Sequence, residues 1–142
     1  MVEFIQLEGF PDEAAQSAYD AGHFVEAIQI LHGWMENQAQ SLLMLVGAVH
    51  FDAEQSDTWD LTDTIGFSTC AKVLFILNQI TKPEYDDLTE LNQMRNKIIH
   101  NLCKERYKFA YEGVPKSDYD KVFKRTLEQI YLLTRKCEQI IE

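Results

Sequence analysis

Hydrophobic residues recur along most of the chain at the spacing of an α-helix. Between residues 23 and 49 an apolar side chain returns every three or four positions, which predicts the longest helix. The ranges 84–104 and 117–140 show the same period, and Ser117–Asp120 predicts a capped start for the last helix. Three long amphipathic helices therefore account for more than half of the chain.

The rest of the pattern predicts shorter elements. Pro11-Asp12-Glu13 suits the first turn of a helix over 11–19, because proline and acidic residues are favoured there. A third substantial helix is expected at 60–80, ending in the all-apolar run Val73–Leu77, which predicts a central, buried segment. The polar, aperiodic residues 51–59 predict a loop, and 105–116 predict a connection.

These elements predict an all-α fold. Helices joined by short connections pack as antiparallel neighbours, so we expect an antiparallel up-down four-helix bundle with a short extra N-terminal helix. A chain of 142 residues has the length of one domain, and no Pro- or Gly-rich linker divides it. Residues 1–142 are therefore expected to form a single helical domain.

One side chain does not fit the pattern of the helix at 84–104. Arg95 falls near the middle of its apolar stripe, which consists of Leu88, Leu91, Met94, Ile98, Ile99 and Leu102. A buried guanidinium is costly unless it is paired, so Arg95 needs an anionic or carbonyl partner or lies at the lip of an interface. The alternative is that its long stem covers apolar surface while its head reaches water. Asn92, Asn96 and His100 share a second face at i, i+4 spacing.

Charge divides the chain at Arg95. The net charge is −10, which argues against a passive nucleic-acid-binding surface, and no DNA partner is expected. Residues 1–94 hold 2 basic and 16 acidic residues, a balance of −14, whereas residues 95–142 hold 11 basic and 7 acidic residues, a balance of +4. The basic residues of this second part form either a local phosphate-attracting patch or a solvated helix face. Those that follow Arg95 include Lys97, Lys104, Arg106, Lys108, Lys116, Lys121, Lys124 and Arg125.

Several other kinds of site and location are not expected. No apolar run approaches the roughly 18 residues that span a bilayer, and the N-terminus lacks the basic start of a signal peptide. Cys70, Cys103 and Cys137 are odd in number, which suits reduced thiols in the cytoplasm. Cys103 follows His100 by three residues, but two ligands are too few for a metal site, so neither metal nor cofactor is expected.

The first third of the chain contains a repeat-like segment and a His–Glu pair on the same helix. Ala18–Ile28 looks like half of a tetratricopeptide repeat, but it has no second copy about 34 residues later, which excludes a repeat array. His32 and Glu36 are i, i+4 neighbours that can pair, and a structural or surface role is favoured for them. Phosphate-cradling glycine loops, nucleophile elbows and series of zinc ligands do not occur in the sequence.

Taken together, these residues resemble the HEPN domain family. An all-helical chain of this length carries Arg-x4-His near the end of its penultimate long helix, with Asn96 directly after the arginine. Ala18–Ile28 matches a small-residue, glycine, aromatic, Glu-Ala-Ile pattern that is common in the family. The resemblance covers residues from about 12 to about 140.

The resemblance implies a dimer in which two motifs face each other across a cleft. Many HEPN domains are metal-independent endoribonucleases, often toxins paired with a nucleotidyltransferase-type antitoxin or linked to phage defence. Carried onto this chain, His100 acts as general base or acid on RNA, Arg95 stabilises the charge of the phosphorane, and Asn96 orients His100 or the phosphate. The products are a cyclic 2′,3′-phosphate and a 5′-hydroxyl. Some toxins of the family carry a modified tyrosine two residues after the histidine; Leu102 stands there in this chain, so that regulation is not carried over.

The chemistry is consistent with the residue types. A neutral histidine accepts protons near pH 7, and an arginine fork matches phosphate oxygens. One motif supplies one histidine, and a two-fold dimer supplies the second. Two other functions remain open: a HEPN-like module that binds a protein partner or nucleotide without catalysis, and an unrelated helical interaction protein.

Overall fold

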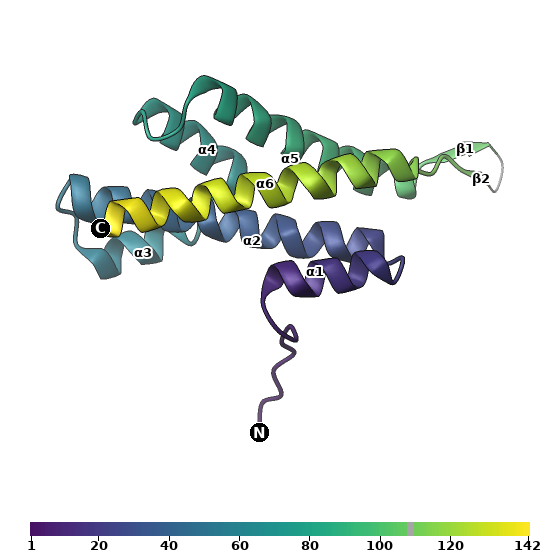
Figure 1. Ribbon diagram of the computed structural model, residues 1–142, viewed down its shortest axis with the longest axis horizontal. Helices are drawn as coiled ribbons and strands as arrows, with labels where there is room; N and C mark the ends of the chain where they lie inside the picture. Colours follow the sequence, from purple (N-terminus) through teal and green to yellow (C-terminus); the bar gives the residue numbers. More distant parts are fainter. Residues whose placement is uncertain (108–109) are drawn as a thin grey trace.

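The computed structural model describes residues 1–107 and 110–142, and these residues are mostly helical (Figure 1). Their six α-helices are α1 (Pro11–Asp20), α2 (Phe24–Leu45), α3 (Gln55–Thr62), α4 (Phe67–Ile76), α5 (Lys82–Leu102) and α6 (Lys116–Ile141). A π-helical turn, η1 (Val46–His50), extends α2, and an antiparallel hairpin of β1 (Glu105–Tyr107) and β2 (Ala110–Tyr111) precedes α6. The predicted helical class is confirmed, with a small hairpin added.

The two longest helices, α2 and α6, lie side by side and run in the same direction. Near their starts, the rings of Phe24 and Tyr119 lie 5.6 Å apart between centroids. Fourteen to fifteen residues further along each helix, the Thr134 hydroxyl donates to the Gln38 side-chain carbonyl at 3.2 Å. Contacts that advance together along both chains show that α2 and α6 are parallel.

Helix α5 runs in the opposite direction. Its Asn92 meets His32 of α2, and its later residue Arg95 meets the earlier residue Gln29. This order differs from the strict up-down alternation of four helices that the sequence predicts, in which α2 and α6 would be antiparallel. The difference arises because α3 and α4 are short and stay near the end of the molecule where α2 finishes, so α5 is the first full return pass (Figure 1).

The prediction of a loop at 51–59 is wrong in its second half. The Glu54 carboxylate accepts the backbone N–H of Asp57 at 2.6 Å, which is the geometry of an N-cap, and α3 begins at Gln55. The polar composition hides this start, because a short helix with little apolar surface has no clear period.

The single helix predicted at 60–80 is wrong because the chain breaks between α3 and α4. The hydroxyl of Thr64 donates to the carbonyl of Leu61, the kind of local bond that competes with helix continuation. Gly66 then adopts an extended backbone as the N-cap of α4. Within α4 the run Val73–Leu77 is less buried than predicted, since Ile76 is 77% exposed.

The start of α5, the helix that carries Arg95 and His100, depends on local contacts and agrees closely with the prediction. Thr81 and Glu84 form a capping box: the Thr81 hydroxyl accepts the Glu84 N–H at 3.3 Å, and the Glu84 carboxylate accepts the Thr81 N–H at 2.9 Å. The predicted N-terminal helix is also present as α1, and Gly22 ends the turn after it with φ +84°, a conformation that favours glycine.

The predicted connection at 105–116 contains structure that the sequence pattern did not indicate. Residues 105–107 and 110–111 form the β1–β2 hairpin, and residues 108–109 lie outside the described residues. Helix α6 begins at Lys116 with Pro115 as its N-cap, so Ser117–Asp120 lies within the first turn rather than before it. Proline fixes the backbone angle that a helix start requires, which explains the earlier boundary.

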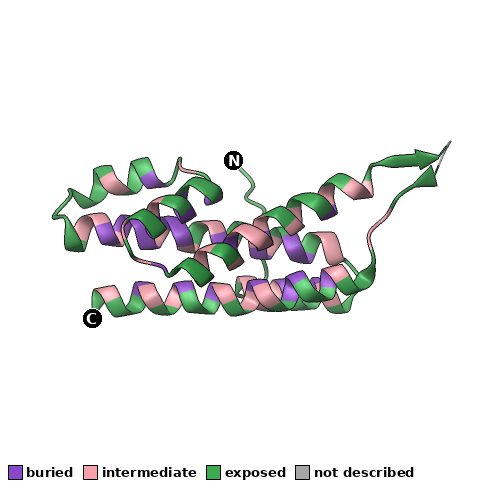
Figure 2. Ribbon diagram, turned by 90° about the horizontal axis from the view of Figure 1, so that it is seen from above, coloured by how far each residue is buried: buried purple, intermediate pink, exposed green. Residues whose placement is uncertain are grey.

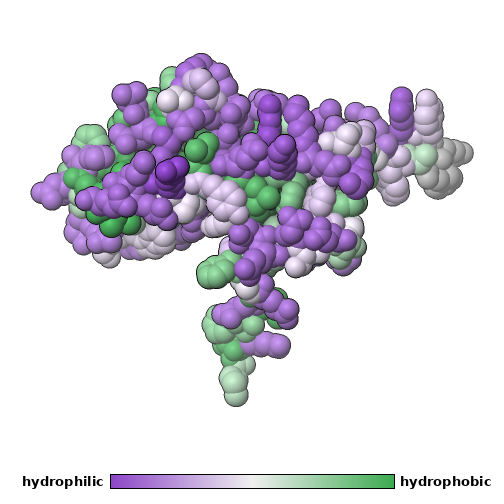
Figure 3. Space-filling view, viewed as in Figure 1, coloured by the Kyte–Doolittle hydropathy of each residue, from purple (hydrophilic) through white to green (hydrophobic). Residues whose placement is uncertain are grey.

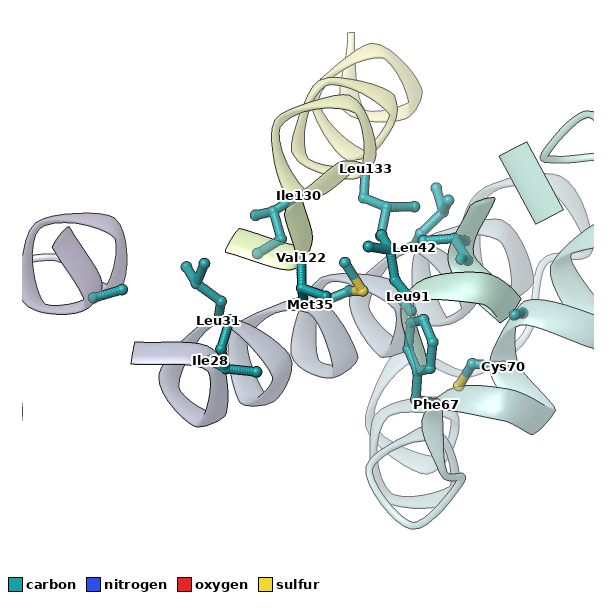
Figure 4. Packing of buried hydrophobic residues seen from close by; sticks show 14 of the residues in the cluster. Ile28, Leu31, Met35, Leu42, Phe67, Cys70, Leu91, Val122, Ile130 and Leu133 are labelled. Atoms are coloured by element: carbon teal, nitrogen blue, oxygen red, sulfur yellow. The ribbon is translucent and has the colours of Figure 1, made fainter. Parts of the chain in front are cut away.

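The core lies where the other helices close around α2. Figure 4 shows buried α2 side chains meeting residues of α6, α4 and α5; the labelled members are Ile28, Leu31, Met35, Leu42, Phe67, Cys70, Leu91, Val122, Ile130 and Leu133. In Figure 2 the buried positions follow the inner faces of the long helices, while the residues of β1 and β2 are exposed. The first ten residues form no helix and lead away from this core, with exposed apolar side chains (Figures 1 and 3).

We expect truncation of Leu31 to destabilise the fold strongly. Its side chain is fully buried in the cluster, so Leu31→Ala removes apolar contact and leaves a cavity, costing about 2–5 kcal/mol of unfolding free energy. Urea denaturation followed by circular dichroism measures the change. Leu61→Ala is the matched control, because Leu61 is 67% exposed on α3 and its loss should change the stability by less than about 0.5 kcal/mol. Equal effects of the two variants would contradict this assignment of the core.

Candidate functional site

The three sequence-predicted site residues lie in the second half of α5. The helix buries Leu88, Leu91 and Ile98 against the core, which fixes its rotation. In that rotation Arg95 is half-buried at the edge of the packed face, and Asn96 and His100 are exposed. Arg95 therefore lies at the edge of the contact between α5 and α2, and it has there the carbonyl partner that was one of the possibilities left open for it.

Neutral oxygen atoms hold the Arg95 guanidinium in place. Its Nε and Nη2 both donate to Oε1 of Gln29 on α2, at 3.2 and 2.8 Å, and its Nη1 donates to Oδ1 of Asn96 at 2.9 Å. In the described part of the chain, Arg95 forms no ion pair with a carboxylate. The side chain is therefore oriented while its positive charge stays uncompensated by a nearby carboxylate, which suits attraction of an anion.

A second pair of side chains joins α2 and α5 one turn away from Arg95. His32 Nε2 lies 3.1 Å from Oδ1 of Asn92, a separation that fits donation by the ring N–H to the amide oxygen. Burial lowers the pKa of His32 below its usual value of 6.5, and the Arg95 charge also lowers it, against the raising effects of Asn92 and Glu36. A neutral His32 thus supports the helix that carries the motif.

A shallow hollow on α5 brings the predicted site residues together. Arg95, Asn96 and His100 all line it, together with Lys97, Ile99 and Asn101. His100 is exposed and forms no hydrogen bond or ion pair within the ranges 1–107 and 110–142, so its imidazole is open to a ligand. The hollow thus combines a fixed cation, an amide and a free imidazole.

His32 and Glu36 have the structural roles that the sequence favours, and the pairing between them that their spacing allows does not form. His32 bonds Asn92 instead, and Oε2 of Glu36 accepts the backbone N–H of Phe67 at 3.0 Å, where it lies at the N-terminus of α4. A carboxylate is favoured there by the unpaired amides and the helix dipole. The spacing along α2 allowed the pairing, but contacts to two other helices decide the outcome.

Gln29 and His32 make contacts with α5 that sequence reasoning missed. They lie 66 and 60 positions before their partners Arg95 and Asn92. Their signal in the sequence is limited to two polar residues at the border of the apolar stripe of α2. Nothing in that pattern indicates which helix faces them.

Much of the basic second part of the chain is paired on α6. Lys121 and Arg125 both lie near the Glu90 carboxylate, at 3.8 and 2.9 Å, and Lys116 contacts Asp120 at 3.0 Å. For this part of α6 the ion pairs favour the solvated helix face over the phosphate-attracting patch; Lys108 lies outside the described residues.

The described residues hold neither a metal cluster nor a membrane-spanning helix, and the chain has no match among the known proteins compared with it. Within the described residues no group of three or more His, Cys, Asp or Glu side chains is arranged to hold a metal ion. No helix among the described residues has the length and apolarity needed to cross a membrane. No family model, curated protein or solved structure with which the chain was compared matches it.

We expect His32 to make the fold less stable in mild acid. Its pKa is lower in the folded chain than in the unfolded chain, so the unfolded chain binds more protons in this range. The stability is fully present above pH 6.5 and falls as the pH drops through the folded-state pKa. His32→Gln keeps a side-chain N–H donor for Asn92 and removes the titration.

Urea unfolding at pH 7.5 and 5.5 (roughly one unit on either side of the usual histidine pKa) measures the difference. His32→Gln should lose less stability than the parent between these values, and His50→Gln, at an exposed position, should behave as the parent does. An unchanged loss in His32→Gln would show that His32 does not carry the effect.

Proposed function

We propose that the chain is a HEPN-type, metal-independent endoribonuclease that acts as a homodimer, with Arg95, Asn96 and His100 in its cleft. The observation that carries the proposal is the anchoring of Arg95 by Gln29 and Asn96. Two amide oxygens orient the guanidinium without cancelling its charge, next to an unoccupied imidazole. A purely structural arginine at this position would more simply pair with one of the many carboxylates of the chain.

The residues suit cleavage by the RNA's own 2′-hydroxyl. As general base, His100 takes the proton from the 2′-oxygen, which attacks the adjacent phosphorus. The bond from phosphorus to the 5′-oxygen breaks, and this oxygen receives a proton from His100 of the partner subunit. The products are a 2′,3′-cyclic phosphate and a 5′-hydroxyl. Arg95 stabilises the negative charge that builds up on the phosphorane oxygens.

A dimer is part of the proposal because one chain supplies one such histidine. General acid and general base act on opposite sides of phosphorus, and a two-fold axis through the cleft brings a second His100 into place. The exposed position of Asn96 and His100 on α5 supports this, since a second subunit can cover them without disturbing the core. The core of each HEPN-like subunit would comprise α2, α4, α5 and α6.

The compartment and the partner are also inferred. Cys70, Cys103 and Cys137 are all free, which suits a reducing cytoplasm. Burial raises the pKa of the Cys70 and Cys137 thiols to about 11, so both stay protonated and unreactive at neutral pH. As a toxin of the HEPN type, the protein would pair with a nucleotidyltransferase-type antitoxin.

The second candidate is a HEPN-like module that binds a protein partner or nucleotide without cutting RNA. The observation that favours it is again at Arg95, because three of its N–H contacts are already used within the free chain. In this function Arg95 serves mainly to join α5 to α2. Binding without cleavage separates the two candidates.

We expect His100→Ala and Arg95→Ala each to reduce RNA cleavage by about a hundredfold or more, because general acid–base catalysis and fixed cations each contribute on this scale. The measurement is cleavage of a mixed RNA by the purified protein in EDTA, with the cyclic phosphate identified by mass spectrometry. His50→Ala, at an exposed position remote in sequence from the motif, should cut as the parent does. RNA that stays intact but bound would favour the second candidate.

We expect Gln29→Glu to weaken RNA binding and cleavage by about tenfold or more. The new carboxylate has the same length and forms an ion pair with Arg95, which withdraws the cation from a phosphate whose contact contributes roughly 1.5–3 kcal/mol. Gln55→Glu adds the same charge at an exposed site on α3 and should have little effect. Anisotropy of a labelled RNA measures the affinity; equal affinity of the two variants would contradict a role for the Arg95 charge.

A further inference from the structure

The β1–β2 hairpin projects beyond the helices directly after the candidate site (Figures 1 and 2). His100 lies five residues before Glu105, where β1 begins. All the described strand residues are exposed. A lone two-stranded hairpin gains little stability from burying side chains, so exposed aromatic residues on it are not explained by the fold.

The hairpin carries two exposed tyrosines. Tyr107 and Tyr111 are each 70% exposed, and the Arg106 guanidinium carbon lies 5.8 Å from the centre of the Tyr107 ring. Tyr107 pairs with Ala110 across the hairpin, and Tyr111 is the next residue of β2. Tyr111 pairs with Glu105, and the pairing register shifts between Glu105 and Tyr107, so both exposed rings stand on the same short, irregular hairpin.

The segment that runs from Arg95 into β1 is basic, in contrast to the chain before it, and this suits contact with a nucleic acid backbone. Residues 95–107 hold four basic residues and one acidic residue, a balance of +3, whereas residues 1–94 have a balance of −14. Lys104 contacts Glu112 at 3.6 Å, and its side chain is 63% exposed. An ion pair this exposed contributes little, so Lys104 can exchange Glu112 for a phosphate.

We propose that the β1–β2 hairpin binds single-stranded RNA, with unpaired bases stacked on Tyr107 and Tyr111 and the backbone contacted by Lys104 and Arg106. Exposed rings beside guanidinium groups form stacking platforms for bases that are free of a duplex. The strand then continues along the end of α5 to Arg95 and His100. The choice of RNA rests on the proposed function.

The choice of single strands over duplexes follows from the geometry. A base inside a duplex has both faces covered by its neighbours, so it cannot stack on a protein ring without being extruded. Two exposed rings on one short hairpin suit a flexible strand whose unpaired bases can turn to reach them. The hairpin therefore selects unpaired regions of RNA, and the helix end beside it supplies the cleavage residues.

The test measures binding in the His100→Ala variant, which keeps the RNA intact. The probe is a fluorescein-labelled RNA of about ten nucleotides of mixed sequence, a common site size for single-strand binders, and the readout is fluorescence anisotropy. We expect Tyr107→Ala and Tyr111→Ala each to weaken binding by about tenfold, and Tyr107→Phe to retain it because the ring remains. The same RNA annealed to its complement should bind more weakly than the single strand.

The control is Phe51→Ala, which removes a ring that is 65% exposed between η1 and α3, at the opposite end of the molecule from the hairpin (Figure 1). It should bind RNA as the His100→Ala parent does. Because the hairpin residues are exposed, circular dichroism should show the same helical content in all variants. A double Tyr107→Ala, Tyr111→Ala variant that binds as tightly as its parent overturns the proposal.

Cleavage assays separate this proposal from the ribonuclease itself. If the wild-type chain cuts RNA and the double tyrosine variant cuts equally well, the hairpin proposal fails and the ribonuclease stands. If binding depends on the tyrosines but the wild-type chain never cuts, the ribonuclease fails and the hairpin site stands. Absence of binding to either form of RNA by the His100→Ala parent overturns the hairpin site.

Discussion

The burial of one face of α2 is the constraint on which the rest of the structure depends. Helices α1, α4, α5 and α6 all pack on α2, and the fully buried side chains of the core include Ile28, Leu31, Met35 and Leu42 from it. Because that face must point inward, the rotation of α2 is fixed, and its border residues Gln29 and His32 point toward α5. The position of Arg95 is thus a consequence of how α2 packs.

The sequence allowed the prediction of the longer helices, whose period and start depend on neighbouring residues. Apolar periodicity and capping signals located α1, α2 and α5, and the misfit of Arg95 within an apolar stripe marked the helix edge where it lies. Helix α3 was missed because a short polar helix has no period, and the hairpin because its strands are two and three residues long. The partners Gln29 and His32 were missed because spacing within one helix does not specify the register between two helices.

The site shows how an acidic protein can present a cation. Most arginines and lysines that this chain places on α6 face carboxylates, whereas Arg95 is held by amides. An amide oxygen carries only a partial charge. It therefore orients the guanidinium while reducing the positive potential around it only slightly. The same reasoning explains why the net charge of −10 says little about the potential at one hollow.

The parallel packing of α2 and α6 has a consequence for how the chain folds. Tyr19 and Asp120 form a side-chain hydrogen bond across 101 positions, and Gln38 meets Thr134 across 96. Contacts so distant in sequence slow folding, because a large loop must close before they form. During synthesis α6 is made after α2 and α5. Until then, Arg95 and His100 lie on helices that lack the buried side chains of α6. The two helices that carry the site therefore gain their complete core only after α6 has left the ribosome.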